Sequence, residues 1–125
     1  MSDTLKICGL TIDRGQKLRT YLPVPDTHVK IPITIINGTE DGKTLLITAG
    51  IHGGEYPGIA AAMELGRDIE PEHVRGCLIM MHPVNIQGFW ARREMIVPED
   101  GKNLNRVFPG DPLGTLADKT AYLIS

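Results

Sequence analysis

Two apolar runs on either side of a helical segment constrain the fold of this chain more than any other feature. Residues 45–51 and 77–84 are near-continuous apolar, which is typical of strands that are covered on both faces. Between them, Pro57 suits the first position of a helix and Pro71 ends it. A strand, a helix and a strand in this order form a βαβ unit, so the two strands are predicted to be parallel and joined by a right-handed crossover.

The rest of the chain adds strands before this unit and a long loop after it. Residues 5–12, 17–24 and 28–36 are rich in Ile, Val, Leu, Thr and Tyr and are separated by turn signals, so each is predicted to be a strand. Residues 85–112 lack a regular pattern, and their aromatic residues indicate an ordered, packed loop. The helix of the βαβ unit is expected to bury one stripe, formed by Ile59, Ala60, Met63, Leu65 and Ile69.

The last segment has the start signal of a helix and no stop signal. Thr115, followed three residues later by Asp118, resembles a capping box and predicts a helix that begins there. The apolar stripe of this helix continues to Ser125 without a C-cap residue. We therefore expect residues 1–125 to form a single domain that is the N-terminal portion of a longer protein.

Composition excludes several classes of function. A net charge of −2 gives no basic field that would attract nucleic acid or an anionic membrane. No apolar stretch approaches the roughly 20 residues that span a bilayer, and the start of the chain lacks the layout of a secretory signal. Cys8 and Cys77 lie in apolar, strand-like runs without CxxC spacing and are expected to be buried, reduced thiols, which is consistent with a cytoplasmic protein.

The clearest chemical signal is His52-Gly53-Gly54-Glu55, placed where the first apolar run turns into the helix. In open α/β sheets, chemistry is usually placed outside the carboxyl ends of the strands. An imidazole and a carboxylate three residues apart can supply two of the three protein ligands of a catalytic zinc ion, and the two glycines let the backbone bend sharply. The alternative is a capped helix start, in which Glu55 is favoured only because it lies near the positive end of the helix.

Two further groups of residues carry chemistry. Residues 103–110 (NLNRVFPG) contain Arg106, whose rigid fork of donors suits a carboxylate, beside the amide of Asn105. Arg92 and Arg93 offer a cation that could stabilise an oxyanion near a hydrolytic metal. Each group also has a plain alternative, namely a turn-rich loop with a surface arginine, and a pair of solvated arginines.

Taken together, residues 49–55 (AGIHGGE) and 100–110 (DGKNLNRVFPG) resemble the succinylglutamate desuccinylase/aspartoacylase family, which belongs to the zinc carboxypeptidase-like superfamily. The resemblance implies a three-layer α/β/α fold with a mixed central sheet, here truncated, with a β-rich N-terminal lead-in. It also implies a zinc-dependent deacylase that hydrolyses the amide (or ester) bond of a small N-acyl amino acid-like substrate. By the same resemblance, His52 and Glu55 would hold Zn²⁺, Asn105 and Arg106 would grip the substrate carboxylate, and Arg92, with Arg93 as the fallback, would polarise the scissile carbonyl.

The chain also departs from the family pattern. The family carries a second histidine ligand in an Asp-x-His block and a glutamate that activates water, and neither block occurs here. Of the remaining histidines, His82 lies near the end of a predicted central strand, and a packed or supporting role is expected for it, while His28 and His73 lie outside any such context. The third zinc ligand and the general base are therefore expected beyond residue 125, and the 125-residue chain alone is expected to be inactive.

Two other functions remain open on the sequence. The chain could be a non-catalytic binding domain that retains the fold. A serine esterase with a His-Gly-Gly oxyanion loop is a weaker alternative, because the sequence has only two serines, Ser2 and Ser125, and no Gly-x-Ser-x-Gly. The acyl group, the amino acid and the oligomeric state are not readable from the sequence.

Overall fold

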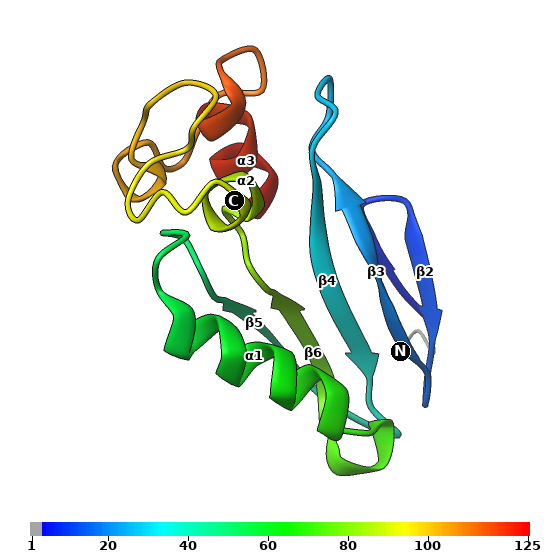
Figure 1. Cartoon of the computed structure of the whole chain (residues 1–125). Helices are drawn as coiled ribbons and strands as arrows, with labels where there is room; N and C mark the ends of the chain where they lie inside the picture. The colour runs from blue at the N-terminus through cyan, green and yellow to red at the C-terminus, as the bar shows by residue number, and fades with distance from the viewer. Residues whose placement is uncertain (1–3) are drawn as a thin grey trace.

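The computed structural model describes residues 4–125 and has an α/β architecture (Figure 1). Six strands, three α-helices and two 3₁₀ turns occur in the described residues. In chain order they are β1 (Thr4–Ile7), β2 (Leu10–Asp13), β3 (Lys17–Pro23), β4 (Lys30–Asn37), β5 (Glu40–Thr48), α1 (Tyr56–Asp68), η1 (Pro71–His73), β6 (Arg75–Met81), α2 (Ile86–Trp90), η2 (Leu104–Arg106) and α3 (Leu116–Ile124).

The central sheet is mixed and contains the predicted βαβ unit. Its strand order is β3-β4-β6-β5, and β1 pairs with β2 in a separate two-stranded sheet. β5 and β6 are parallel, with Ile47 opposite Met80, whereas β4 pairs antiparallel with both β3 and β6. The parallel pairing confirms the strand–helix–strand prediction, and the mixed sheet confirms the predicted fold class.

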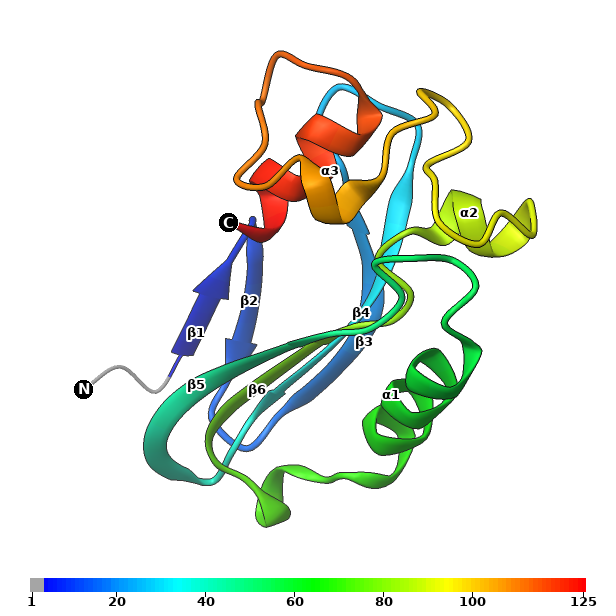
Figure 2. The same ribbon diagram turned by 90° about the vertical axis from the view of Figure 1, so that its left-hand side faces the viewer.

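Figure 2 shows the layers: α1 covers one face of the sheet, and the β1–β2 hairpin lies on the other face together with α3. The larger apolar cluster fills the second face, where Ile31, Ile33 and Ile35 of β4 point toward the hairpin and α3. A smaller cluster, formed by Ile36, Leu78 and Met80, lies on the opposite face. Side chains of β4 therefore alternate between two different apolar clusters, as the two-residue period of a strand requires.

The first predicted strand is a hairpin. Residues 5–12 form parts of β1 and β2, which pair with Ile7 opposite Leu10. The chain reverses at Cys8 and Gly9, which have φ values of 47° and 80°. The prediction that Cys8 is buried is therefore wrong: Cys8 is exposed in the turn, Cys77 is partly buried, and both thiols are free.

The strand before the diglycine also differs from expectation. β5 begins at Glu40, before the apolar run at residues 45–51, and ends at Thr48. β5 pairs with β6 alone and forms one edge of the sheet. Leu45 and Leu46, which point to opposite faces, remain 58% and 42% exposed. The prediction of a strand covered on both faces is wrong within residues 4–125, because Leu45 and Leu46 remain exposed on opposite faces of an edge strand.

Helix α1 buries a narrower stripe than its apolar residues indicated. Ile59, Ala62 and Gly66 are its buried residues, whereas Met63 and Leu65 are 46% and 45% exposed. The reason is a close approach at Gly66, where an added Cβ would lie 3.0 Å from Thr34 Oγ1 of β4. The helix thus lies against the sheet along Ile59, Ala62 and Gly66, while Met63 and Leu65 lie outside the contact.

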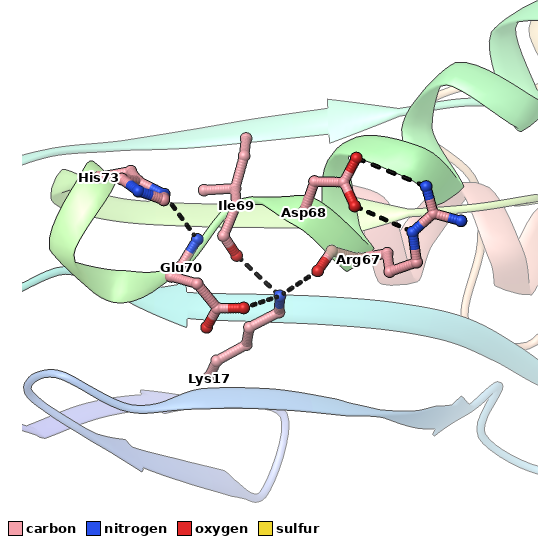
Figure 3. Close-up of polar contacts among 6 residues, drawn as sticks. All are labelled: Lys17, Arg67, Asp68, Ile69, Glu70 and His73. Atoms are coloured by element: carbon pink, nitrogen blue, oxygen red, sulfur yellow. Dashed lines mark hydrogen bonds and ion pairs between the residues drawn. The ribbon is translucent and has the colours of Figure 1, made fainter.

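A lysine from β3 fixes the C-terminal end of α1, as Figure 3 shows. Lys17 Nζ donates to the carbonyl oxygens of Arg67, at 3.0 Å, and Ile69, at 2.7 Å, and lies 3.4 Å from Glu70 Oε1. The last carbonyls of a helix lack intrahelical partners and carry the negative end of its dipole. The ammonium group therefore both satisfies these oxygens and ties α1 to the sheet.

The loop at residues 85–112 is ordered by two buried aliphatic side chains. Val97 is 3% exposed and Leu104 is fully buried, whereas Trp90 is 75% exposed and Phe108 38% exposed. The loop is ordered as predicted, but its aromatic residues are not its main anchors. α3 begins where the sequence indicated, and the backbone N–H and the hydroxyl of Thr115 both donate to Asp118. No helix within residues 4–125 is long and apolar enough to cross a membrane.

Candidate functional site

The seven residues between β5 and α1 form a compact turn at the carboxyl end of β5. Gly50 has a φ of +72°, a left-handed conformation that permits the chain to leave the strand sharply, and an added Cβ there would lie 2.7 Å from Pro83. The backbone N–H of Glu55 donates to His52 O at 3.2 Å, which closes the turn. His52 and Glu55 are therefore held at the mouth of the sheet, where the strand gives way to the helix.

The side chains of His52 and Glu55 converge. His52 Nδ1 lies 3.2 Å from Glu55 Oε2, and Glu55 Oε1 accepts from the backbone N–H of His52, also at 3.2 Å. A tetrahedral zinc ion with ligand distances of about 2.0–2.2 Å separates two of its ligand atoms by roughly 3.3–3.5 Å. The observed separation is within about 0.2 Å of that range, so the two side chains fit a shared zinc ion with little movement.

The diglycine allows this turn to pack directly against another backbone segment. An added Cβ on Gly53 would lie 2.4 Å from the carbonyl carbon of Gly88 and 2.5 Å from the nitrogen of Phe89. Gly54 donates its N–H to Glu94 O at 3.2 Å. Because no side chain separates the two segments, α2 and the loop after it lie against the His52–Glu55 turn.

Asn85 holds this neighbouring segment in place. It is 4% exposed, its Oδ1 accepts from the N–H of Gly88 at 2.9 Å, and its Nδ2 donates to Ile96 O at 3.0 Å. The amide therefore links the first turn of α2 to the loop that carries Arg92 and Arg93. Sequence reasoning did not single out Asn85, although an asparagine directly before a helix is a recognisable N-cap signal.

Arg92 lies beside the turn rather than in contact with its ligating atoms. It has a φ of 57° and, together with Tyr56, Phe89 and Trp90, lines a surface hollow of about 460 Å³. Tyr56 follows Glu55 directly and packs edge-on against Phe89, with ring centroids 6.0 Å apart. The structure thus places Arg92 next to the start of α1, while Arg93 is tied by its N–H to Gly88 O at 2.9 Å.

The second motif reaches His52 through a residue that sequence reasoning missed. His52 Nε2 lies 2.9 Å from Asn103 Oδ1, although the two residues are 51 positions apart. Asn103 is also the N-cap of η2, since its Oδ1 accepts from the N–H of Asn105 at 3.0 Å. Asn103 is the first residue of the 103–110 block, in which the sequence pointed to Asn105 and Arg106 instead.

Asn105 and Arg106 lie in η2, and both are exposed. Their backbones are fixed: the N–H of Arg106 donates to Asn103 O at 2.9 Å, and Leu104 between Asn103 and Asn105 is fully buried. In the part of the chain that the structure describes, their side chains make no hydrogen bond or ion pair with His52 or Glu55. The structure therefore brings His52, Glu55 and Asn103 together and leaves Asn105 and Arg106 at the surface next to them.

The other histidines have separate surroundings. His82 is 5% exposed, and its Nε2 lies 2.8 Å from Thr34 Oγ1 at the buried contact between α1 and the sheet. Burial lowers the pKa of His82, and its Nδ1 has no hydrogen-bond partner among residues 4–125. His73 accepts from the N–H of Glu70 in η1, and His28 lies near Gln87. His82 thus has the packed position that was expected for it.

Of the two serines, Ser125 alone lies within the described residues. Ser125 donates its hydroxyl to Ala121 O at 3.0 Å at the end of α3, and Ser2 lies outside the described residues. Among residues 4–125, no group of three or more His, Cys, Asp or Glu side chains is arranged to hold a metal ion. The chain therefore offers two converging ligands of the kinds that zinc prefers, supported by one amide.

Comparison with a family model gives a match over residues 41–123, and the model describes the succinylglutamate desuccinylase/aspartoacylase catalytic domain. The matched range runs from β5 to α3 and so includes the His52–Glu55 turn, α2 and η2. The β1–β2 hairpin, β3 and β4 lie outside this range.

Characterised and solved proteins agree with this match. The N-alpha-acetyl-L-2,4-diaminobutyric acid deacetylase of Halomonas elongata is 43% identical over 93 residues, which make up 74% of this chain and 27% of that protein. The crystal structure of a succinylglutamate desuccinylase/aspartoacylase from Rhodobacter sphaeroides superposes with a TM-score of 0.84 and 35% identity, over 94% of this chain and 38% of that one. The product-bound ectoine utilization protein EutE of Ruegeria pomeroyi superposes with a TM-score of 0.80 and 36% identity, over 89% of this chain and 36% of that one. The chain thus spans between about a quarter and two fifths of the length of these relatives.

Proposed function

The chain belongs to the succinylglutamate desuccinylase/aspartoacylase family, and from this premise we propose that it forms the N-terminal portion of the catalytic domain of a zinc-dependent deacylase. The reaction is the hydrolysis of the amide bond of a small N-acyl amino acid, with water as the second substrate. The observation that carries the proposal is the convergence of His52 Nδ1 and Glu55 Oε2, 3.2 Å apart, at the carboxyl end of β5.

His52 and Glu55 would hold the zinc ion from one short turn. When bound, zinc would polarise the scissile carbonyl and make a coordinated water more acidic, to a pKa of about 7. A catalytic zinc site ordinarily has three protein ligands, so we place the third ligand and the general-base glutamate beyond residue 125. On this basis, the 125-residue chain by itself binds zinc weakly and hydrolyses little or no substrate.

The cationic residues have distinct proposed roles. Arg92, which lines the hollow beside Tyr56, stabilises the negative charge that develops on the attacked carbonyl oxygen. Arg106 and Asn105 are exposed next to Asn103 and bind the substrate carboxylate, for which the guanidinium fork supplies two parallel donors. In this arrangement the loop after α2 contacts the scissile carbonyl and η2 binds the carboxylate. These two segments flank the His52–Glu55 turn.

The relatives guide the choice of substrates to test. The Halomonas relative is named for the deacetylation of an N-acetylated diamino acid, so N-acetyl-2,4-diaminobutyrate heads the panel, followed by N-acetyl and N-succinyl amino acids. We also propose a cytoplasmic location, which the two free cysteines support, because reducing compartments keep thiols unpaired.

Zinc binding by the chain tests the proposal directly. Isothermal titration of zinc into the wild-type chain, His52→Ala and Glu55→Gln should give measurable binding only for the wild type. His73→Ala is the matched control, since it removes an exposed histidine at the opposite end of α1 and should bind zinc as the wild type does. Equal zinc affinity of His52→Ala and the wild type would refute the proposed metal site.

A further inference from the structure

The amide of Asn103 has a fixed orientation. One of its terminal atoms accepts from the backbone N–H of Asn105 at 3.0 Å, and a backbone N–H can only donate. The accepting atom must therefore be the carbonyl oxygen Oδ1, since the amide nitrogen has no lone pair to offer. This assignment follows from the hydrogen-bond network itself, which is how the two ends of an asparagine amide are distinguished.

The same oxygen determines where His52 carries its proton. His52 Nε2 lies 2.9 Å from Asn103 Oδ1 in a partly buried contact. Because Oδ1 carries no hydrogen, Nε2 must donate, and in the neutral imidazole the lone pair is then on Nδ1. Turning the ring by half a turn would replace both nitrogens by carbons in these positions and would remove both polar contacts.

The other side of the ring could in principle compete for the proton. Glu55 Oε2 lies 3.2 Å from Nδ1, and a carboxylate is a strong acceptor. The Glu55 side chain is 53% exposed, however, so water can solvate its oxygens or the side chain can turn away. Asn103 has no such freedom, because Asn105 holds its oxygen, and an Nε2 lone pair facing that oxygen at 2.9 Å would be repelled. The less mobile contact therefore decides the tautomer.

The position of Asn103 is itself enforced by its neighbours in the sequence. Leu104, which follows it, is fully buried in the larger apolar cluster. Lys102, which precedes it, pairs with Asp118 of α3 at 2.7 Å. Asn103 is thus held between a core anchor and an ion pair, and its side chain is presented to His52 by a fixed segment of backbone.

We infer that Asn103 is a positioning residue that keeps the His52 proton on Nε2, so that the Nδ1 lone pair and Glu55 Oε2 face the metal position together. This inference rests on the proposed zinc function, but the proton position can be measured without metal. A partner on the non-ligating nitrogen fixes the orientation of a metal-binding imidazole and raises its basicity. In this role Asn103 acts through His52 and touches neither substrate nor metal.

Two variants separate the hydrogen bond from the space that the side chain fills. Asn103→Asp keeps an acceptor at the same place, and Asn103→Leu has similar volume without an acceptor. Long-range ¹H–¹⁵N spectra of the metal-free protein near pH 8.5, where histidine is ordinarily neutral, show which ring nitrogen of His52 carries the proton. We expect Nε2–H in the wild type and in Asn103→Asp, and Nδ1–H donating to Glu55 in Asn103→Leu.

Zinc titration of the same three proteins gives the second readout. Asn103→Leu should bind zinc roughly 10- to 100-fold more weakly than the wild type, and Asn103→Asp should bind it at least as tightly. An unchanged far-ultraviolet spectrum and unfolding midpoint of Asn103→Leu would show that the loss is not caused by misfolding.

The outcomes are distinguishable. An Nδ1–H ring in the metal-free wild type, or equal zinc affinity of the wild type and Asn103→Leu, would overturn the role of Asn103 while leaving the zinc site in place. A wild-type protein that shows the Nε2–H ring but binds no zinc in its full-length form would instead refute the proposed function, and the metal-positioning role of Asn103 with it.

Discussion

Replacing Gly53 by alanine tests whether the close approach of two backbones sets the geometry of the site. The new Cβ would lie 2.4 Å from the Gly88 carbonyl carbon, whereas non-bonded carbons ordinarily approach to about 3.5–4.0 Å. One of the two segments must therefore move by about 1 Å. Overpacking of this kind costs about 1–3 kcal/mol, and the reduced freedom of the unfolded chain offsets about 0.4–1 kcal/mol of it. We expect a net loss of roughly 1–2 kcal/mol in the free energy of unfolding.

The displacement should weaken zinc binding as well as folding. Metal sites tolerate deviations of about 0.2 Å in ligand distances, so a shift of about 1 Å in the turn between His52 and Glu55 should lower zinc affinity at least tenfold, or about 1.4 kcal/mol. Urea unfolding measures the first effect and zinc titration the second.

Gly58→Ala is the matched control, because it makes the same chemical change five residues further on. Gly58 lies in α1, and an added Cβ there would meet no atom within 4 Å. This variant should leave zinc affinity unchanged and stabilise the protein by about 0.5–1 kcal/mol through helix propensity. If Gly53→Ala had the stability and zinc affinity of the wild type, the turn would not depend on its approach to Gly88, and the account of the diglycine would be wrong.

Two further predictions concern the scaffold. Lys17→Met leaves the carbonyl oxygens at the end of α1 without their ammonium donor (Figure 3). It should lower the free energy of unfolding by about 2 kcal/mol in urea titrations. The control Lys43→Met, at an exposed position of β5, should change this free energy by less than about 0.5 kcal/mol. Equal effects of the two substitutions would show that the contact does not stabilise the helix. Burial lowers the pKa of His82 below the value of about 6.5 for an unfolded chain, so protonation favours the unfolded state. The contribution of neutral His82 to stability is complete above about pH 6.5 and is lost as the pH falls toward the folded pKa. Urea unfolding between pH 5 and 8 should therefore show that the free energy of unfolding falls more steeply with decreasing pH for the wild type than for His82→Gln. Parallel pH dependences of the two proteins would contradict a lowered pKa of His82.

Short-range signals predicted the elements that local chemistry determines. The βαβ unit followed from two apolar runs with a proline-initiated helix between them; β6 and α1 lie within a few residues of the predicted positions, whereas β5 begins earlier, at Glu40. Thr115 and Asp118 predicted the start of α3, where they form the expected hydrogen bonds. In each case the deciding contacts join residues that are close in sequence.

Burial was harder to predict, because it depends on what lies beside an element. The composition of β5 is typical of a central strand, but within residues 4–125 it has one neighbour and leaves Leu45 and Leu46 exposed. The apolar pattern of α1 pointed to its large side chains, whereas the sheet is approached through Gly66. Hydrophobicity identified the residues that favour burial, but not the helix face that lies close enough to the sheet to be buried.

The candidate site shows the same division between local and long-range information. His52 and Glu55 were identified because one turn contains both, and the structure places His52 Nδ1 3.2 Å from Glu55 Oε2. Asn103 was not identified, because its contact with His52 spans 51 residues and depends on the packing of the loop that carries η2. Spacing within a motif cannot reveal which residue of a second motif faces it.

The site therefore depends on residues that carry no charge. Gly53 permits the α2 loop to lie against the His52–Glu55 turn, Asn85 fixes that loop, and Asn103 contacts the imidazole from the other side. A ligand atom that is misplaced by even a few tenths of an ångström loses metal affinity, so these three residues set how well His52 and Glu55 can act. Each of these three residues acts through a close backbone approach or a fixed amide. Substitutions of these residues should therefore perturb the site even when they leave its charge unchanged.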